Sequence, residues 1–150
     1  KADHLHQEVS VVPTPPLFNY APEDIETALV AHLTSLRRCG FARAAGDPLP
    51  FTLVNHITGT ESAGEGVADP VVSIHTLCDK ALGAPAARDE ATKTHRRMLA
   101  LMVDPTITIG ARTIAVQYIE VVEQPRWEYY SDAILRKVGR YRIGLPYVAV

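Results

Sequence analysis

Two stretches of this sequence repeat apolar residues at helical spacing, and the stretches between and after them alternate apolar with polar residues. The first helical stretch runs from Pro22 to a stop at Gly40, and the second runs from Ala86 to Met102. A helix with one apolar stripe needs a sheet or another helix to cover that stripe. The order helix, strand, strand, helix and then three strands therefore predicts an α+β fold, with an antiparallel or mixed β-sheet and two α-helices packed on one face.

The first predicted helix has end signals as well as a stripe. Pro22 suits the first helical position, and Gly40 allows a left-handed stop. Arg37 and Arg38 lie in the expected last turn, where the helix macrodipole favours cations. The apolar stripe consists of Ile25, Ala28, Leu29, Leu33 and Leu36. The stripe of the second helix consists of Ala87, Ala91, His95, Met98 and Met102.

Two strands are predicted between the helices. In residues 51–58, period-two spacing places Phe51, Leu53 and Ile57 on one face. Residues 70–78 predict the second strand. One side of it carries Val72, Ile74 and Cys78, and the other carries Ser73 and His75.

The segment between these strands, residues 59–70, predicts a mobile hairpin loop, because it is rich in glycine and acid and poor in large apolar groups. Its acids are Glu61, Glu65 and Asp69. Their spacing departs from the calcium loop of an EF-hand, which favours a solvated loop over a metal site.

The C-terminal third predicts further sheet. Residues 106–123 predict a tight hairpin with a long second strand, residues 123–132 an irregular aromatic connection, and residues 132–139 a short helical turn. The final strand, 139–150, alternates an apolar face with a polar face. Pro146 has no N–H to donate, so the strand is expected to lie at a sheet edge there or to end nearby.

The chain has 150 residues, and a single domain typically holds roughly 100 to 200. We expect one domain over residues 22–150, preceded by an extended Pro-rich N-terminal arm at residues 1–21. Phe18 and Tyr20 are apolar residues of this arm, so we expect it to lie against a surface of its own chain or of a neighbour.

The charge balance argues against nucleic-acid and membrane binding. The 15 basic and 17 acidic residues give a formal charge of -2, so there is no overall attraction to either anionic partner. No run of about 18 apolar residues predicts a membrane span. Cys39 and Cys78 are too few for a disulfide framework and are expected to be buried, free thiols.

A search for chemistry finds no convincing site. His4 and His6 lie in the arm, where metal ligands are not held in place. His75 and Cys78 are an odd number of residues apart on a strand and so point to opposite faces. The glycines match no phosphate-binding motif. The sequence therefore predicts no metal, no cofactor and no catalytic residue.

A cluster of aromatic and charged residues is the better functional candidate. It comprises Arg126, Trp127, Tyr129 and Tyr130, which are residue types enriched at interface hot spots. The alternative is that Trp127 closes the end of the core. Arg140 and Arg142 lie on the outward face of the last strand, which is either a solvated face or a docking stripe.

The order and spacing of several motifs resemble tail terminator proteins of long-tailed, siphovirus-type bacteriophages that infect actinobacteria. The likeness covers residues 22–148. After an opening amphipathic helix, the motifs are GDPLPF, DPVVSIHT, THRRML, VEQPRWEYYSD and RYRIGLPY.

The resemblance implies a structural protein of the virion, located at the tail neck and assembled in the host cytoplasm. Such proteins are not enzymes; they form a hexameric ring that caps the tail tube, stops its polymerisation and joins the tail to the head connector. The implied partners are further copies of the chain, the major tail tube protein and the head-closure or connector protein. Genomic DNA would pass through the lumen without specific binding.

The matching stretch suggests subunit or neck contacts at Arg126, Trp127, Glu128 and Tyr130. The acidic residues of segment 59–70 are candidates for the lumen wall, where they would let DNA slide. Two alternatives stay open: another neck component, such as a head-tail joining or head-closure protein, and a small ligand-binding or enzymatic α+β domain. The last predicts a deep pocket with convergent polar groups.

Overall fold

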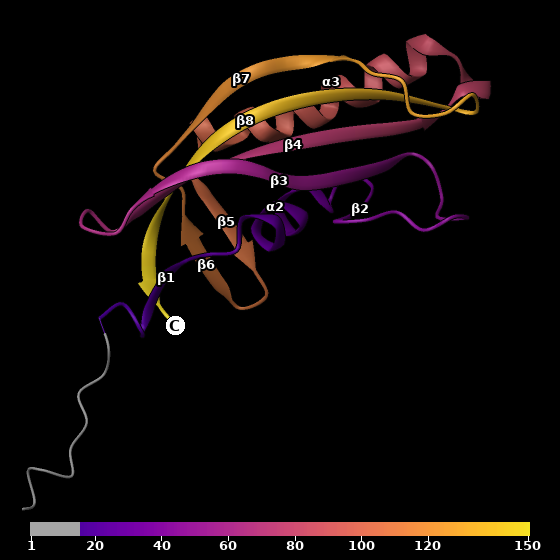
Figure 1. The fold of residues 1–150 in the computed structure, drawn as a ribbon. Coiled ribbons are helices and arrows are strands. Elements are labelled where there is room, and N and C mark those ends of the chain that lie inside the picture. The colour runs from indigo at the N-terminus through magenta and orange to yellow at the C-terminus, as the bar shows by residue number, and fades with distance from the viewer. Residues whose placement is uncertain (1–15) are drawn as a thin grey trace, which may run out of the picture.

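A computed structural model describes residues 16–150, so the predictions for His4, His6 and most of the arm lie outside the described residues. The described part contains a six-stranded curled sheet, a separate two-stranded hairpin and two α-helices (Figure 1). In chain order the elements are β1 (Tyr20–Pro22), α2 (Ile25–Leu33), β2 (Arg38–Gly40), β3 (Phe51–Ser62), β4 (Val67–Asp79), the 3-10 helix η2 (Lys80–Leu82), α3 (Ala84–Leu99), η3 (Ala100–Met102), β5 (Thr106–Ile109), β6 (Arg112–Ala115), β7 (Tyr118–Trp127) and β8 (Ile134–Ala149).

Strand β8 pairs with more strands than any other strand of the sheet. It pairs with β4 on one side, and with β7 and then β1 on the other. β3 follows β4, and the short β2 joins β3 in parallel, so the sheet is mixed. At roughly 3.3 Å per residue, the 16 residues of β8 span about 50 Å. The two ends of β8 are therefore far apart.

Both helices and the β5–β6 hairpin cover the same face of the sheet (Figure 1). Buried side chains from all of these elements meet there, among them Leu29, Leu33, Val54, Val72, Ile74, Met98, Leu101, Ile107, Tyr141 and Ile143. Burying one such side chain stabilises the fold by roughly 1.5–3 kcal/mol. The predicted α+β fold, with two helices on one face of a mixed sheet, is confirmed.

Helix α2 is shorter at both ends than its sequence pattern predicts. It begins after Asp24, whose carboxylate accepts a hydrogen bond from the backbone N–H of Thr27 at 3.1 Å. This cap satisfies a helix donor that a start at Pro22 would leave free, and Pro22 lies in β1 instead. At the other end, Arg38 begins β2 and does not lie in the last turn.

Arg37 explains why the helix stops early. Its guanidinium forms an ion pair with Glu90 of α3 at 2.9 Å. The same group donates to the hydroxyls of Thr52 at 2.8 Å and Thr94 at 2.5 Å. The side chain is only 4% exposed. The prediction that Arg37 lies in the last turn of the helix is thus wrong, because α2 ends at Leu33 and Arg37 joins α3 to β3.

Strands β3 and β4 form one long hairpin. Gly59 pairs with Pro70 and Glu61 with Ala68, so the turn is confined to residues 63–66. The prediction of a mobile loop over residues 59–70 is therefore wrong. The backbone pairing extends beyond the apolar part of the strands, and this could not be inferred from apolar periodicity alone.

The prediction that Ile57 shares a face of β3 with Phe51 and Leu53 is also wrong. Val54 packs in the core with both helices, so Phe51 and Leu53 point to the opposite face of the sheet. A β-bulge between His56 and Thr58 then shifts the register, and Ile57 is exposed. In β4, by contrast, Val72, Ile74 and Cys78 share one face as predicted, and both faces of that strand are buried.

Helix α3 starts at Ala84, two residues before the predicted start, and ends at Leu99, three residues before the predicted end. Its buried face contains Ala87, Ala91 and Met98 as predicted, with Thr94 in place of His95. Met102 lies in η3 and is exposed, because the last turn tightens before Asp104.

The C-terminal region contains more strand than predicted. The tight hairpin is β5–β6, but its second strand ends at Ala115, and the chain re-enters the large sheet at Tyr118 as β7. β7 continues to Trp127, and β8 includes most of the predicted helical turn at 132–139. β8 also continues past Pro146, where the backbone N–H of Tyr147 donates to the carbonyl of Gly66 at 2.7 Å.

Gly139 makes room for the buried Tyr141. A methyl group on Gly139 would lie 2.7 Å from the Tyr141 hydroxyl oxygen and 3.2 Å from Cγ of Pro125. The ring cannot easily move away, because it is buried and its hydroxyl lies 2.6 Å from Nδ1 of His95.

We expect Gly139→Ala to lower the free energy of unfolding by about 1–3 kcal/mol, the usual cost of overpacking. Urea denaturation would measure it. In a Tyr141→Phe background the loss should be smaller, because the nearest clashing atom is gone. An equal loss in both backgrounds would show that the hydroxyl is not the obstacle.

Candidate interface surfaces

The predicted contact residues are divided between the two ends of β8. Phe18 and Tyr20 lie at the end where β1 pairs with the last residues of β8, which we call the arm end. Leu17, Phe18 and Tyr20 are all exposed, and Phe18 is 69% exposed. The backbone N–H of Val150 donates to the carbonyl of Asn19 at 2.8 Å, which holds the arm beside β8. The described part of the arm thus presents apolar side chains that its own core does not cover.

The aromatic residues gather at the other end, where β7 ends and β8 begins, which we call the aromatic end. Trp127, Tyr129 and Tyr130 are exposed there, and Trp127 is 42% exposed. Cations lie over two of the rings: Nζ of Lys137 is 5.0 Å from the Trp127 ring centroid, and the Arg136 guanidinium is 5.3 Å from that of Tyr130. Trp127 is not among the buried core residues, which favours a contact residue over a side chain that closes the core.

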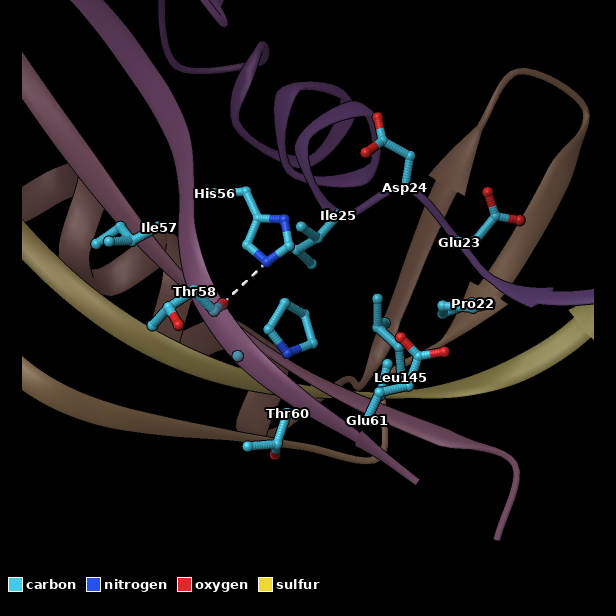
Figure 2. Close-up of a pocket in the computed structure, with 13 residues that line it drawn as sticks. Pro22, Glu23, Asp24, Ile25, His56, Ile57, Thr58, Thr60, Glu61 and Leu145 are labelled. Carbon is cyan, nitrogen blue, oxygen red and sulfur yellow. Dashed lines mark hydrogen bonds between the residues drawn. The ribbon is translucent and has the colours of Figure 1, made fainter. Parts of the chain in front are cut away.

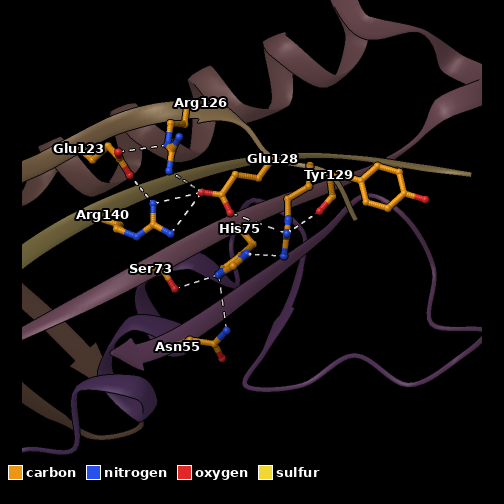
Figure 3. Close-up of polar contacts among 9 residues, drawn as sticks. Asn55, Ser73, His75, Glu123, Arg126, Glu128, Tyr129 and Arg140 are labelled. Atoms are coloured by element: carbon orange, nitrogen blue, oxygen red, sulfur yellow. Dashed lines mark hydrogen bonds and ion pairs between the residues drawn. The ribbon is translucent and has the colours of Figure 1, made fainter. Parts of the chain in front are cut away.

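An ion-pair network joins several predicted residues on the sheet face opposite the helices (Figure 3). Glu128 accepts from Arg140 at 3.2 Å and forms an ion pair with Arg126 at 3.2 Å. Glu123 pairs with Arg126 at 3.1 Å and also with Arg140. The network lowers the pKa of Glu123, mainly through its hydrogen bond to Arg140. The structure thus brings together three of the predicted residues, Arg126, Glu128 and Arg140, with Glu123 as the shared partner that the sequence analysis missed.

His75 lies beside this network and is 8% exposed. Its Nε2 is 2.9 Å from Oγ of Ser73 and 3.5 Å from Nδ2 of Asn55, and its Nδ1 is 3.4 Å from the Arg136 guanidinium. Burial, and after it the positive charge of Arg136, lowers the pKa of His75 to about 4. The imidazole is therefore neutral at neutral pH.

The Ser73–His75 pair superficially resembles a nucleophile and its base. Such a pair needs a reachable hydroxyl and an oriented, basic imidazole. Ser73 is buried, and His75 has lost basicity. Within residues 16–150, four cavities of about 240 to 520 Å³ have other linings, and neither Ser73 nor His75 contributes to them. The geometry supports a structural hydrogen-bond chain, not nucleophilic catalysis.

The remaining predicted residues are engaged separately. Arg142 pairs with Glu120 at 2.7 Å on the solvent side of β7 and β8. Asp69 accepts a hydrogen bond from the Tyr118 hydroxyl at 2.5 Å, and Glu61 accepts one from the Tyr147 hydroxyl. Glu65 lies at the tip of the β3–β4 turn and is exposed.

A cavity of about 520 Å³ lies between the start of α2 and the β3–β4 hairpin (Figure 2). Glu23 and Glu61 contribute carboxylates to its lining. Each is already bound, Glu23 by Arg112 and Glu61 by Tyr147. The imidazole of His56 lies 2.9 Å from the carbonyl of Thr58 (Figure 2). The carboxylates of this cavity, including that of Asp24, which accepts from Thr27, thus have partners outside its lining instead of converging on its centre.

The two thiols and His32 are buried or partly buried and already accounted for by packing or hydrogen bonding. Cys39 and Cys78 are both free, and burial raises the pKa of Cys39 to about 11. Within residues 16–150, no cluster of three or more His, Cys, Asp or Glu side chains is arranged to hold a metal ion. His32 is buried with Nε2 2.7 Å from the carbonyl of Arg97, as expected for a satisfied core histidine.

Comparison with known protein families and with curated protein sequences finds no match to this chain. Among the helices described, none has the length and apolarity needed to cross a membrane. Inference about function therefore depends on the surfaces of the molecule.

The residues that sequence reasoning missed share a cause. Glu123, Arg136 and His75 complete the ion-pair and hydrogen-bond network, yet they come from three different strands. Their meeting depends on the register of β7 against β8 and of β8 against β4. The one available signal was the alternation of Arg136, Val138 and Arg140 along β8, which places both arginines on one face.

Proposed function

We propose that this chain is the tail terminator of a long-tailed bacteriophage, a structural protein located at the tail neck of the virion. Copies form a hexameric ring that caps the tail tube, stops its polymerisation and docks the head-closure or connector protein. Genomic DNA passes through the lumen. The assignment to this family rests on the resemblance of residues 22–148, and the ring rests on the surfaces described above.

The observation that carries the ring is the placement of two unlike apolar surfaces at opposite ends of β8. The arm end exposes Leu17, Phe18 and Tyr20, and the aromatic end exposes Trp127 and Tyr129. A two-fold dimer joins the same patch on both copies, whereas a ring joins two different patches head to tail. A chain with a different apolar patch at each end suits the ring.

An enzymatic or ligand-binding role has less support. It calls for a pocket with convergent polar groups and perturbed pKa values. The strongly shifted imidazole of His75 lines none of the four cavities described above, and the cavity beside α2 has polar groups that are already paired. A role without catalysis therefore fits the described residues better.

Electron microscopy and native mass spectrometry of the purified chain, with and without tube subunits, test the proposal. We expect sixfold rings that bind the tube end and stop its growth. Rings that bind the connector but not the tube would instead favour another neck component. A chain that stays monomeric with tube subunits present, or that turns over a small molecule, would contradict the proposal.

Trp127→Ala is expected to weaken ring assembly by about tenfold or more, because partly exposed aromatic anchors dominate interface energies. Its effect on the free energy of monomer unfolding should stay below about 1 kcal/mol, since the indole side chain of Trp127 lies outside the core. Sedimentation velocity would give the first quantity and urea denaturation the second. Val122→Ala is the matched control, because Val122 is exposed on the same strand away from the aromatic end. Equal loss of stability and assembly would indicate core packing.

A further inference from the structure

A basic cleft of about 390 Å³ lies between α3 and β7, next to the aromatic end. His95, Arg96 and Lys137 line it, together with the apolar side chains of Leu99 and Pro125. Lys137 also lies over the ring of Trp127, so the cleft and the exposed aromatic residues form one continuous surface. None of the described residues that line the cleft carries a carboxylate. The cleft is therefore a cationic hollow with no anion of its own.

His95 adds a neutral donor to this cleft. The Tyr141 hydroxyl is buried and lies 2.6 Å from Nδ1 of His95. Burial raises the pKa of Tyr141, so its hydroxyl stays protonated, and within residues 16–150 Nδ1 of His95 is the hydrogen-bond partner to which it can donate. The neutral imidazole then carries its own hydrogen on Nε2. One N–H, one guanidinium and one ammonium in a hollow suit a single carboxylate.

The same chain presents a narrow carboxylate at its other end. Glu65 lies in the turn between β3 and β4, beside Ala63 and Gly64, and all three are exposed. Hydrogen bonds from the backbone N–H of Glu65 to Ser62 and of Gly66 to Ala63, both 3.2 Å, close the turn. Within residues 16–150, no hydrogen bond or ion pair engages the Glu65 carboxylate. The tip is thus slim, rigid and anionic.

Glu65 cannot reach the cleft of its own chain. The turn is fixed beside Tyr147, whose backbone N–H donates to the carbonyl of Gly66 at 2.7 Å. The cleft lies beside Lys137, ten residues earlier on β8, which is roughly 33 Å away at 3.3 Å per residue. The carboxylate and the cations can therefore meet only between two copies.

We infer that the β3–β4 turn of one copy inserts Glu65 into the basic cleft of the next copy, where Arg96, Lys137 and His95 bind the carboxylate. The contact is head to tail, because turn and cleft lie at opposite ends of β8. It rests on the proposed ring and supplies one of its subunit contacts. It also excludes Glu65 from the lumen wall, so the lumen position expected from charge alone and this contact are alternatives.

Cysteine cross-linking tests the contact directly, in the presence of tube subunits. Ala63→Cys and Thr92→Cys place a thiol on the turn and one in the cleft lining, and the Glu65 carboxylate is kept. Under mild oxidation the double variant should form covalent multimers up to six copies. Each single variant controls for the native thiols, and Ala63→Cys combined with Val103→Cys controls for random collision, because Val103 is highly exposed but does not line the cleft. Equal yields from the control pair would overturn the contact.

Charge reversal tests the chemistry. Glu65→Lys and Arg96→Glu should each weaken assembly by at least about tenfold, because each puts like charges together. The double variant Glu65→Lys with Arg96→Glu should recover most of the loss. If the wild type and both single-reversal variants all form rings, and no cross-link forms, the contact is overturned and the proposed ring is left intact. A wild-type chain that stays monomeric would overturn the proposed function and the contact with it.

Discussion

Replacing Arg37 with methionine is expected to lower the free energy of unfolding by about 3–5 kcal/mol, the typical cost of breaking a buried ion pair. Methionine fills a similar volume but cannot donate to Glu90, Thr52 or Thr94. The Glu90 carboxylate would lose its main partner while staying three-quarters buried, as its side chain is 27% exposed. The penalty is large because the partner groups remain after the cation has gone.

Urea denaturation of the variant against the native chain would measure this loss. Arg38→Met is the matched control, since Arg38 is 62% exposed and its nearest carboxylate, on Asp47, is 3.9 Å away. We expect that control to change stability by no more than about 0.5 kcal/mol. Arg37→Lys should fall between the two, because lysine keeps the charge but loses the planar set of donors. Similar small losses from Arg37→Met and Arg38→Met would show that the buried pair contributes little.

Periodicity predicted the elements of this fold better than their ends. Helix α3 and strand β4 lie within a few residues of their predicted positions, because each has a regular spacing and a strong chain break after it. Residues 132–139 have the apolar spacing of a helical turn but pair with β4 in the sheet. Tertiary pairing overrides local preference there, and local preference is all that a short segment contributes.

The sequence predicted which aromatic residues form a contact surface, but it did not predict the charged residues that lie beside them. Exposed aromatic residues at 127–130 could be expected from composition and from the resemblance. The cations that accompany them, Arg136 and Lys137, lie in a segment predicted to be helical. Two irregularities in the β7–β8 register, on either side of Glu123, decide which charges meet. No rule of alternation predicts the position of such bulges.

The pH dependence of stability should report the buried His75. Its pKa is about 4 in the folded chain and close to 6.5 in the unfolded chain. Between these values His75 is protonated in the unfolded chain but stays neutral in the native chain. The free energy of unfolding therefore falls as pH falls from about 6.5 to about 4. Above 6.5 both states are neutral and this contribution is constant. The slope for one such group approaches about 1.4 kcal/mol per pH unit.

The hydrogen bonds of His75 explain why its imidazole stays neutral in the native chain. Arg136 can only donate, so Nδ1 of His75 must accept, and Nε2 then carries the hydrogen and donates to Ser73. Protonation would place a second hydrogen on Nδ1, facing the Arg136 guanidinium. Glu128 favours the charged imidazole, but burial, Arg136 and Arg140 together outweigh it.

Urea midpoints at pH 7, 6 and 5 should therefore show a loss of about 2 kcal/mol from His75 alone. This range lies above the titration of Glu90 and Glu123, whose lowered pKa values would add a loss of the same sign at lower pH. His75→Asn should remove about that much of the pH dependence, whatever its effect on stability at pH 7. His32 and His95 also have lowered pKa values and should keep a residual slope in that variant. A slope unchanged by His75→Asn would mean that the imidazole takes up its proton in the native state, and the hydrogen-bond chain through Ser73 and Arg136 would then need a different arrangement.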